Sequence, residues 1–226
     1  MTQPLIVFDL DGTLVETAPD LINALNTIFR AEGIPEVPPV EARTMIGGGL
    51  RPFIEKGLQA EGMSCQPEEI DRLFRDMVDH YSAHIADLSH PFPGVVPALD
   101  RLEAEGYRFA VCTNKLEGLS VQLLTALDLH RRFAVVCGPD TFGIAKPDPR
   151  MLLQTIEAAG GDPRRAVMVG DSNTDITTAR AAAIPVIAVN FGYTDRPVEM
   201  FGPDVMIDHF DRLPQTVEGI LASLRL

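Results

Sequence analysis

The chain has 226 residues, 46% of them hydrophobic and 23% charged, a globular composition with room for one sizeable core or a core domain plus a smaller one. It contains no run of about eighteen apolar residues, so no membrane partner is expected, and its net charge of −13 disfavours nucleic acid, which binds basic surfaces. Cys65, Cys112 and Cys137 form neither a disulfide framework nor a CxxC motif, and the first residues lack a basic segment and a cleavage site, which together predict a cytoplasmic protein.

Short apolar runs alternate with helical patterns along the chain. Runs that are apolar throughout are typical of strands buried on both faces, as in a parallel sheet. Five such runs are residues 5–8, 109–112, 134–137, 166–169 and 186–189, and residues 204–207 fit an edge strand. Alternation of this kind predicts an α/β fold with a doubly wound, Rossmann-like parallel sheet.

The stretch between the first apolar run and about residue 92 breaks this alternation. It carries helical patterns and no predicted strand. Apolar residues recur at helical spacing over residues 18–29 and again over residues 70–85. We therefore expect a smaller all-helical cap domain over residues 16–92, inserted after the first strand of a core domain made of residues 1–15 and 93–226.

Polar residues follow four of the predicted strands. The carboxyl ends of parallel strands meet at one edge of a sheet, where ligands bind. Core packing does not require polar residues there, so they are candidates for a functional site. They are Asp9–Thr13, Thr113–Lys115, Lys146–Asp148 in the loop after the third strand, and Gly170–Asp175.

The acidic residues at this edge predict a metal site. Asp9 and Asp11 are two residues apart, so in an extended chain their side chains point the same way. Asp171 and Asp175 are four apart at a predicted helix start and share a face. Four carboxylates facing one point repel one another unless a cation neutralises them, and oxygen ligands of this kind select Mg²⁺.

Basic and hydroxyl groups at the same edge predict a site for an anion. Lys146 precedes a proline in a loop and can project toward an anion. Thr113 and Asn114 lie where a strand turns into a helix, where backbone N–H groups meet phosphate oxygens. These parts suit attack on phosphorus by one carboxylate, while a second carboxylate moves the proton of the leaving alcohol.

These residues resemble, in order, the four motifs of the haloacid dehalogenase superfamily, and the resemblance covers essentially the whole chain. The helical insertion resembles the first type of cap in that superfamily. The motifs are Asp9-x-Asp11-Gly12-Thr13, Thr113-Asn114, Lys146-Pro147 and Gly170-Asp171-x-x-x-Asp175. Residues 8–14, 113–115, 170–172 and the late Phe191-Gly192-Tyr193 look most like the phosphoglycolate phosphatase branch.

The resemblance implies roles for individual residues. Asp9 would be the nucleophile that forms an aspartyl phosphate, and Asp11 the acid and base. The metal ligands would be the Asp9 carboxylate, the Asp11 backbone carbonyl and Asp171, with Asp175 nearby. Thr113 and Lys146 would bind phosphate. Superfamily dehalogenases lack the second aspartate, so Asp11 argues against that activity.

The resemblance also implies a function. The expected enzyme is a Mg²⁺-dependent phosphatase acting on a small phosphorylated metabolite, with 2-phosphoglycolate as the first choice of substrate. A lid over the site excludes bulky substrates and bulk water, which motivates a small substrate. A monomer or a homodimer is expected.

Three further features carry less weight. Gly47-Gly48-Gly49 is either a helix end and loop or, by resemblance, a specificity loop that brings Gly48 and Arg51 to the substrate. Lys115 adjoins the phosphate motif, which favours a role at the site. His80 and His84 are four apart on a helix, but without a third ligand they indicate a surface pair.

Other functions share these motifs. A phosphomutase of the β-phosphoglucomutase kind would pass the phosphoryl group to a sugar, and a pyrophosphatase of the same branch is a further alternative. A non-catalytic switch, in which an aspartate accepts phosphate to control a partner, belongs to a different class. The paired Asp9 and Asp11 argue against a switch, because an acid and base beside the acyl phosphate promotes its turnover.

Overall fold

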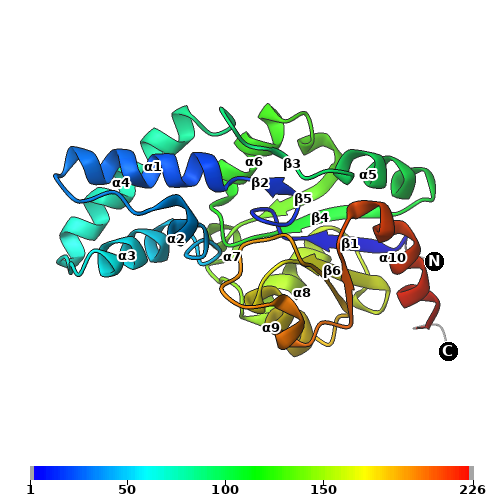
Figure 1. Ribbon diagram of the computed structural model, residues 1–226. Helices are drawn as coiled ribbons and strands as arrows, with labels where there is room; N and C mark the ends of the chain where they lie inside the picture. The colour runs from blue at the N-terminus through cyan, green and yellow to red at the C-terminus, as the bar shows by residue number, and fades with distance from the viewer. Residues whose placement is uncertain (1–2, 224–226) are drawn as a thin grey trace.

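A six-stranded parallel sheet forms the centre of the molecule, in a computed structural model that describes residues 3–223 (Figure 1). The strand order is β5-β4-β1-β6-β7-β8. In the central strand, Ile6 pairs with Phe109 on one side and with Val167 on the other. The strands are β1 (Leu5–Phe8), β4 (Arg108–Cys112), β5 (Phe133–Cys137), β6 (Ala166–Gly170), β7 (Val186–Val189) and β8 (Val205–Ile207). All six predicted strands are therefore confirmed, the edge strand included.

Helices cover both faces of this sheet, which explains why its strands are apolar throughout. In β1, Ile6 and Phe8 pack in one apolar cluster, whereas Leu5 and Val7 pack in another on the opposite face. The first face is covered by α5 (Val95–Ala104), α6 (Glu117–Ala126) and α10 (Leu213–Ser223), and the second by α8 (Pro149–Ala158) and α9 (Asn173–Ala181). This is the doubly wound arrangement that the sequence predicts.

Shorter helical segments complete this part of the molecule. They are α7 (Pro139–Phe142) and the 3₁₀ turns η1 (His130–Arg132), η2 (Pro163–Arg165), η3 (Val198–Phe201) and η4 (Phe210–Arg212). Among residues 3–223, no helix combines the length and the apolar character that crossing a bilayer requires.

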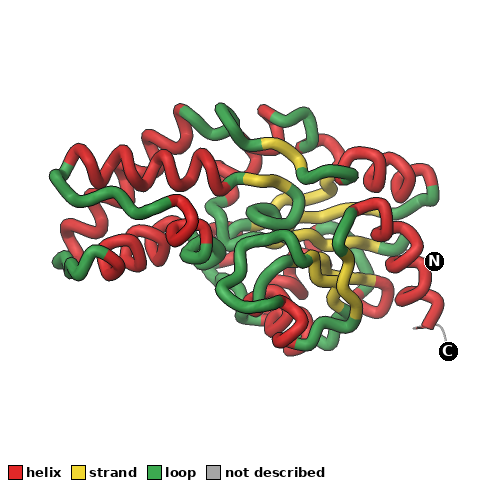
Figure 2. Tube along the Cα trace, in the orientation of Figure 1, coloured by secondary structure: helices red, strands yellow, loops and turns green. Residues whose placement is uncertain are grey.

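Four helices form a separate lobe beside the sheet (Figures 1 and 2). They are α1 (Ala18–Ala31), α2 (Pro39–Arg43), α3 (Leu50–Ala60) and α4 (Pro67–Ala83). The predicted apolar stripes face inward, because Leu25 and Phe29 of α1 and Leu73 and Met77 of α4 are buried. The lobe corresponds to the predicted cap, whose exact boundaries stay a prediction.

A short antiparallel pair of strands lies where the chain enters and leaves this lobe (Figure 2). In it, β2 (Val15–Glu16) pairs with β3 (His90–Pro91). The prediction that no strand lies between the first strand and residue 92 is therefore wrong. Strands of two residues are too short to show a period of two, and a proline argues against a strand. The pair fastens the two connections of the lobe to each other.

Candidate active site

Asp9 lies directly after the buried strand β1, at the carboxyl edge of the sheet. Its backbone N–H donates to the carbonyl of Val169 at 2.9 Å, and its Oδ1 accepts from the Leu10 N–H at 2.7 Å. The residue is only 7% exposed. Burial, followed by the charge of Asp175, raises the pKa of Asp9 to about 7. The structure thus holds a carboxylate in a fixed, largely desolvated position at the end of the central strand.

Three buried carboxylates meet at this edge. Asp9, Asp171 and Asp175 each offer an oxygen, and these oxygens lie within 4.8 Å of one another. Burial, then the charges of Asp175 and Asp9, raise the pKa of Asp171 to about 8. Burial and mutual repulsion therefore disfavour the negative charge on these carboxylates, and the protein balances it only in part. A divalent cation would balance it, and carboxylate oxygens are what a hard cation binds, so the residues fit such an ion.

Lys146 is the cation that the chain itself supplies to this cluster. Its Nζ lies 2.9 Å from Asp9 Oδ1 and 2.6 Å from Asp175 Oδ1. Burial alone would lower the pKa of Lys146, but the two carboxylates outweigh that effect and raise it, so the side chain stays charged. Lys146 therefore projects from its loop to the acidic edge of the sheet, and its predicted contact with a substrate anion stays a prediction.

Asn114 connects three segments rather than projecting freely into the site. Its Oδ1 accepts from the Lys146 N–H at 2.9 Å, and its Nδ2 donates to the Lys146 carbonyl at 3.1 Å. Nδ2 also lies 3.3 Å from the carbonyl of Gly47 in the helical lobe. Asn114 therefore holds the backbone that carries Lys146 and links it to the loop around residue 47.

The side chain of Asp11 points away from the three-carboxylate cluster, which corrects the expectation of four carboxylates at one point. The Nζ of Lys115 lies 2.8 Å and 3.0 Å from its two oxygens. The chain is not extended here, since the N–H of Leu14 donates to the Leu10 carbonyl and Gly12 has φ +82°. This tight turn separates the two carboxylates that extended geometry would align.

Two residues without a predicted individual role, Thr13 and Tyr193, hold the Asp171 carboxylate from opposite sides. Thr13 Oγ1 donates to Asp171 Oδ1 at 2.9 Å, and the backbone N–H of Tyr193 donates to Oδ2 at 2.7 Å. A Cβ on Gly192 would lie 2.2 Å from the Asp171 side chain, so this position requires glycine. Thr13 and Tyr193 both lie in the motifs of the sequence, but only their contacts with Asp171, which is distant in the chain, show what they do.

Asp175 begins helix α9 and also belongs to the acidic cluster. Its Oδ2 accepts from the Ser172 hydroxyl at 2.6 Å and from the Ser172 and Asp171 N–H groups, while Oδ1 contacts Lys146. Asp175 is therefore both a residue of the first helical turn and a member of the site. One of its oxygens pairs with the Lys146 ammonium group and the other accepts three hydrogen bonds, whereas each oxygen of Asp171 accepts one, so Asp175 suits a supporting position beside a metal better than a direct ligand.

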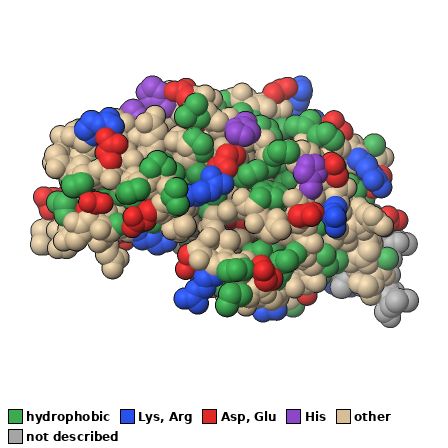
Figure 3. Space-filling model, in the orientation of Figure 1, with side chains coloured by type: hydrophobic (Ala, Val, Ile, Leu, Met, Phe, Trp, Pro, Cys, Tyr) green, Lys and Arg blue, Asp and Glu red, His purple; other side chains and the backbone are tan. Residues whose placement is uncertain are grey.

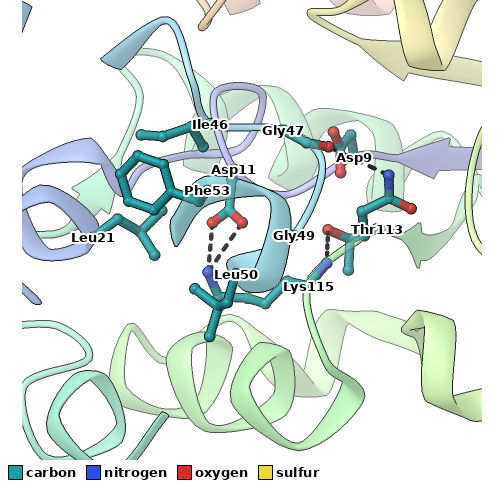
Figure 4. A pocket seen from close by; sticks show the side chains of 11 residues that line it. Asp9, Asp11, Leu21, Ile46, Gly47, Gly49, Leu50, Phe53, Thr113 and Lys115 are labelled. Atoms are coloured by element: carbon teal, nitrogen blue, oxygen red, sulfur yellow. Dashed lines mark hydrogen bonds and ion pairs between the residues drawn. The ribbon is translucent and has the colours of Figure 1, made fainter. Parts of the chain in front are cut away.

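A pocket opens between this edge of the sheet and the helical lobe (Figure 4). Its floor is polar and comes from the sheet, whereas the lobe supplies an apolar roof. The sheet side of the lining consists of Asp9, Asp11, Thr113, Asn114 and Lys115, and the side of the lobe consists of Leu21, Ile46, Gly47, Gly49, Leu50 and Phe53. The apolar spacing of the lobe predicts core residues, and spacing alone does not distinguish the core from the roof of a pocket. Thr113 is buried there, and its Oγ1 accepts from the Lys115 N–H at 3.2 Å.

Gly48 and Arg51 do not line this pocket, although their neighbours Gly47 and Gly49 do. Arg51 pairs with Asp71 on the outside of the lobe and lies over the Phe74 ring. Figure 3 shows acidic and basic side chains interspersed in this manner over one face of the molecule. The glycine loop therefore reaches the pocket through Gly47 and Gly49, whereas Arg51 makes its contacts on the outside of the lobe.

The predicted surface pair of histidines also stays apart from the site. The rings of His80 and His84 lie 4.6 Å apart between centroids, and His84 Nδ1 contacts Asp87. Across residues 3–223, Asp9, Asp171 and Asp175 are the only cluster of three or more acidic, histidine or cysteine side chains arranged to share an ion.

Comparisons with known proteins agree with this geometry. The model of the haloacid dehalogenase-like hydrolase family matches residues 6–189. Phosphoglycolate phosphatase from Mesorhizobium japonicum is 51% identical, covering 96% of this chain and 95% of the relative, and N-acetylmuramic acid 6-phosphate phosphatase from Pseudomonas aeruginosa is 34% identical, covering 96% of each. The crystal structure of a predicted phosphoglycolate phosphatase from Haemophilus somnus 129pt superposes with a TM-score of 0.88 at 28% identity, covering 96% of this chain and 98% of that one. The chain belongs to the haloacid dehalogenase-like hydrolase family.

Proposed function

We propose that this protein hydrolyses a small phosphomonoester through a phosphorylated Asp9. The observation that carries the proposal is the position of Asp9, which contacts Lys146, shares a cluster with Asp171 and lines the pocket under the helical lobe. A carboxylate that lines a pocket, with cationic and hydroxyl groups beside it, is equipped for attack on phosphorus.

The residues fit a magnesium ion. The carboxylates of Asp9 and Asp171 and the backbone carbonyl of Asp11 would hold it, with Asp175 supporting. When bound, Mg²⁺ supplies neutralising charge for the phosphoryl oxygens and orients the group for displacement. Asp171 is pre-positioned for this role by Thr13 and Tyr193, which fix both of its oxygens.

The chain's own groups divide the reaction into two steps. In the first, an oxygen of Asp9 forms a bond to phosphorus as the ester oxygen leaves, and Asp11 gives that oxygen a proton. In the second, Asp11 removes a proton from water, the water oxygen bonds to phosphorus, and inorganic phosphate leaves Asp9 free again. Lys146, Thr113 and nearby backbone N–H groups hold the phosphoryl oxygens throughout.

The substrate we propose is 2-phosphoglycolate, which would be cleaved to glycolate and phosphate. The Mesorhizobium relative is a phosphoglycolate phosphatase, and the Pseudomonas relative acts on N-acetylmuramic acid 6-phosphate. Each of these substrates is an acid that also carries a phosphate. A pocket closed by apolar side chains of the helical lobe favours the smaller of the two. Free cysteines, two of them buried, fit the proposed cytoplasmic location.

A phosphate-release assay over small phosphoesters tests the proposal. Phosphoglycolate should be hydrolysed with Mg²⁺ and not with EDTA, and Asp9→Asn should lower the rate by about a thousandfold or more. Retention of about a tenth of the rate would mean that the nucleophile lies elsewhere. Product formation that requires a bisphosphorylated sugar would identify a phosphomutase, and a long-lived phosphoprotein without phosphate release would identify a switch.

A further inference from the structure

Lys115 is a charged side chain held in an unusual place. Its side chain is 2% exposed, and its Nζ contacts both oxygens of Asp11 and lies 4.6 Å from the centre of the Tyr81 ring. An ammonium group has three hydrogens to donate, and the two contacts with Asp11 use two of them. The third lies beside Tyr81, with which Lys115 also interacts, so a ligand that enters the pocket shares or displaces one of these contacts.

Lys115 is also the one cationic side chain among the residues that line this pocket, within residues 3–223. Lys146, the other buried lysine near the site, contacts Asp9 and Asp175, does not line the pocket, and serves the phosphoryl group in the proposed reaction. The roof consists of Leu21, Leu50 and other apolar groups. If a substrate carries a second negative charge beyond its phosphate, Lys115 is therefore the cation of the pocket lining that this charge can contact.

The positions of Asp9 and Asp11 decide which part of the substrate reaches Lys115. Figure 4 shows Asp9 and Thr113 on one side of the pocket, with Asp11 and the Lys115 ammonium group on the side of Leu21 and Leu50. The phosphorus must lie at Asp9, and the leaving oxygen must lie at Asp11 to receive its proton. The group attached to that oxygen then extends past Asp11 toward Lys115.

We propose that Lys115 binds a second anionic group of the substrate, a carboxylate one methylene from the ester oxygen, and so selects acids that carry a phosphate. This inference rests on the proposed phosphatase function and assigns Lys115 to the leaving group instead of the phosphate. The incoming carboxylate shares or replaces the contact that Lys115 makes with Asp11. Recognition of the substrate acid is thereby coupled to the residue that protonates the leaving oxygen.

Matched substrates test this assignment. The ester 2-hydroxyethyl phosphate has the skeleton of phosphoglycolate, with CH₂OH in place of the carboxylate. Lys115→Met removes the charge but keeps the length of the side chain, and Lys115→Arg keeps a charge. Both variants disturb Asp11, so the informative quantity is the ratio of kcat/KM for the two esters, from which that shared effect cancels.

The wild-type protein should prefer phosphoglycolate, and Lys115→Met should reduce that preference by about 30-fold or more, the effect of removing one partner of a buried charge pair. Lys115→Arg should retain most of the preference. An unchanged ratio in Lys115→Met would overturn the assignment. So would a selective loss of pyrophosphate hydrolysis, because Lys115 would then serve a second phosphate.

Inhibitors separate this proposal from the choice of substrate. Both 3-phosphonopropionate and 3-hydroxypropylphosphonate are measured as inhibitors of p-nitrophenyl phosphate hydrolysis in wild type and Lys115→Met, with thermal melting as the check on folding. If the carboxylate compound binds more tightly and loses that advantage in Lys115→Met, the assignment stands even where phosphoglycolate is not turned over. Equal binding of the two compounds to the wild type would overturn it.

Discussion

The Thr13 hydroxyl donates a hydrogen bond of 2.9 Å to Oδ1 of Asp171, which joins two motifs that lie 158 residues apart in the chain. The bond fixes one oxygen of a proposed metal ligand, and the Tyr193 N–H fixes the other. Residues that orient metal ligands in this way usually affect metal affinity as well as geometry.

We predict that Thr13→Val lowers the affinity for Mg²⁺ by about 10- to 100-fold, because it keeps the shape of the side chain and removes the donor to Asp171. Thr13→Ser keeps the hydroxyl and is the matched control, which should stay close to wild type. Calorimetric titration of chelator-treated protein with Mg²⁺ measures the effect. Equal Mg²⁺ affinity in the valine and serine variants would show that the Thr13 hydroxyl does not support Asp171 as a metal ligand.

We also predict that Gly192→Ala damages the site. A Cβ at this position would lie 2.2 Å from the Asp171 side chain, so Asp171 or the loop must move, at an overpacking cost of about 1–3 kcal/mol. Gly219→Ala is the control, because nothing lies within 4 Å of its added Cβ and alanine favours its helix. The free energy of unfolding, measured with urea, and the Mg²⁺-dependent activity should both fall in Gly192→Ala and stay unchanged in Gly219→Ala. Full activity in that variant would contradict the tight packing at Asp171.

The pKa values of Asp9 and Asp171 predict how the metal-free protein responds to pH. Both folded-state values lie above the ordinary 3.8, at about 7 and about 8, so the folded protein holds protons that the unfolded chain has released. This contribution to stability is complete below about pH 4 and is lost as the pH rises toward 8.

The free energy of unfolding in EDTA should therefore fall between about pH 4 and about pH 8 through these two groups, and Mg²⁺ should restore more stability at pH 8 than at pH 5. Asp171→Asn should flatten the pH dependence, because an amide does not titrate. Thermal melting with EDTA and with Mg²⁺ measures both effects. A Mg²⁺ effect that does not grow with pH would argue against binding at these carboxylates.

The strands of the sheet could be predicted from the sequence because burial on both faces produces a simple local pattern. Strands buried on both faces must be apolar at every position, and β1 and β6 are. The turn after β1 could not be predicted from the spacing of Asp9 and Asp11. The two-residue separation of Asp9 and Asp11 predicts a shared direction only for extended chain, whereas backbone bonds to the Leu10 carbonyl fold it into a turn.

The supporting contacts of the site were beyond prediction for a different reason. The roles of Thr13 and Tyr193 depend on which segments meet in three dimensions, and neither residue type carries a signal for that. The two-residue strands β2 and β3 are likewise defined by each other and not by any local pattern. The apolar stripes of the helical lobe gave no sign that Leu21 and Phe53 face a pocket instead of only the core.

The central claim is that phosphorus becomes bonded to Asp9. Asp11→Asn should leave Asp9 able to attack p-nitrophenyl phosphate, whose leaving group needs no proton, while slowing the water step that Asp11 assists. Acid quenching followed by peptide mass spectrometry should then find one phosphoryl group on the peptide that contains Asp9, and none in Asp9→Asn. A phosphoryl group on another residue, or p-nitrophenol release from Asp9→Asn at the rate of Asp11→Asn, would contradict the account.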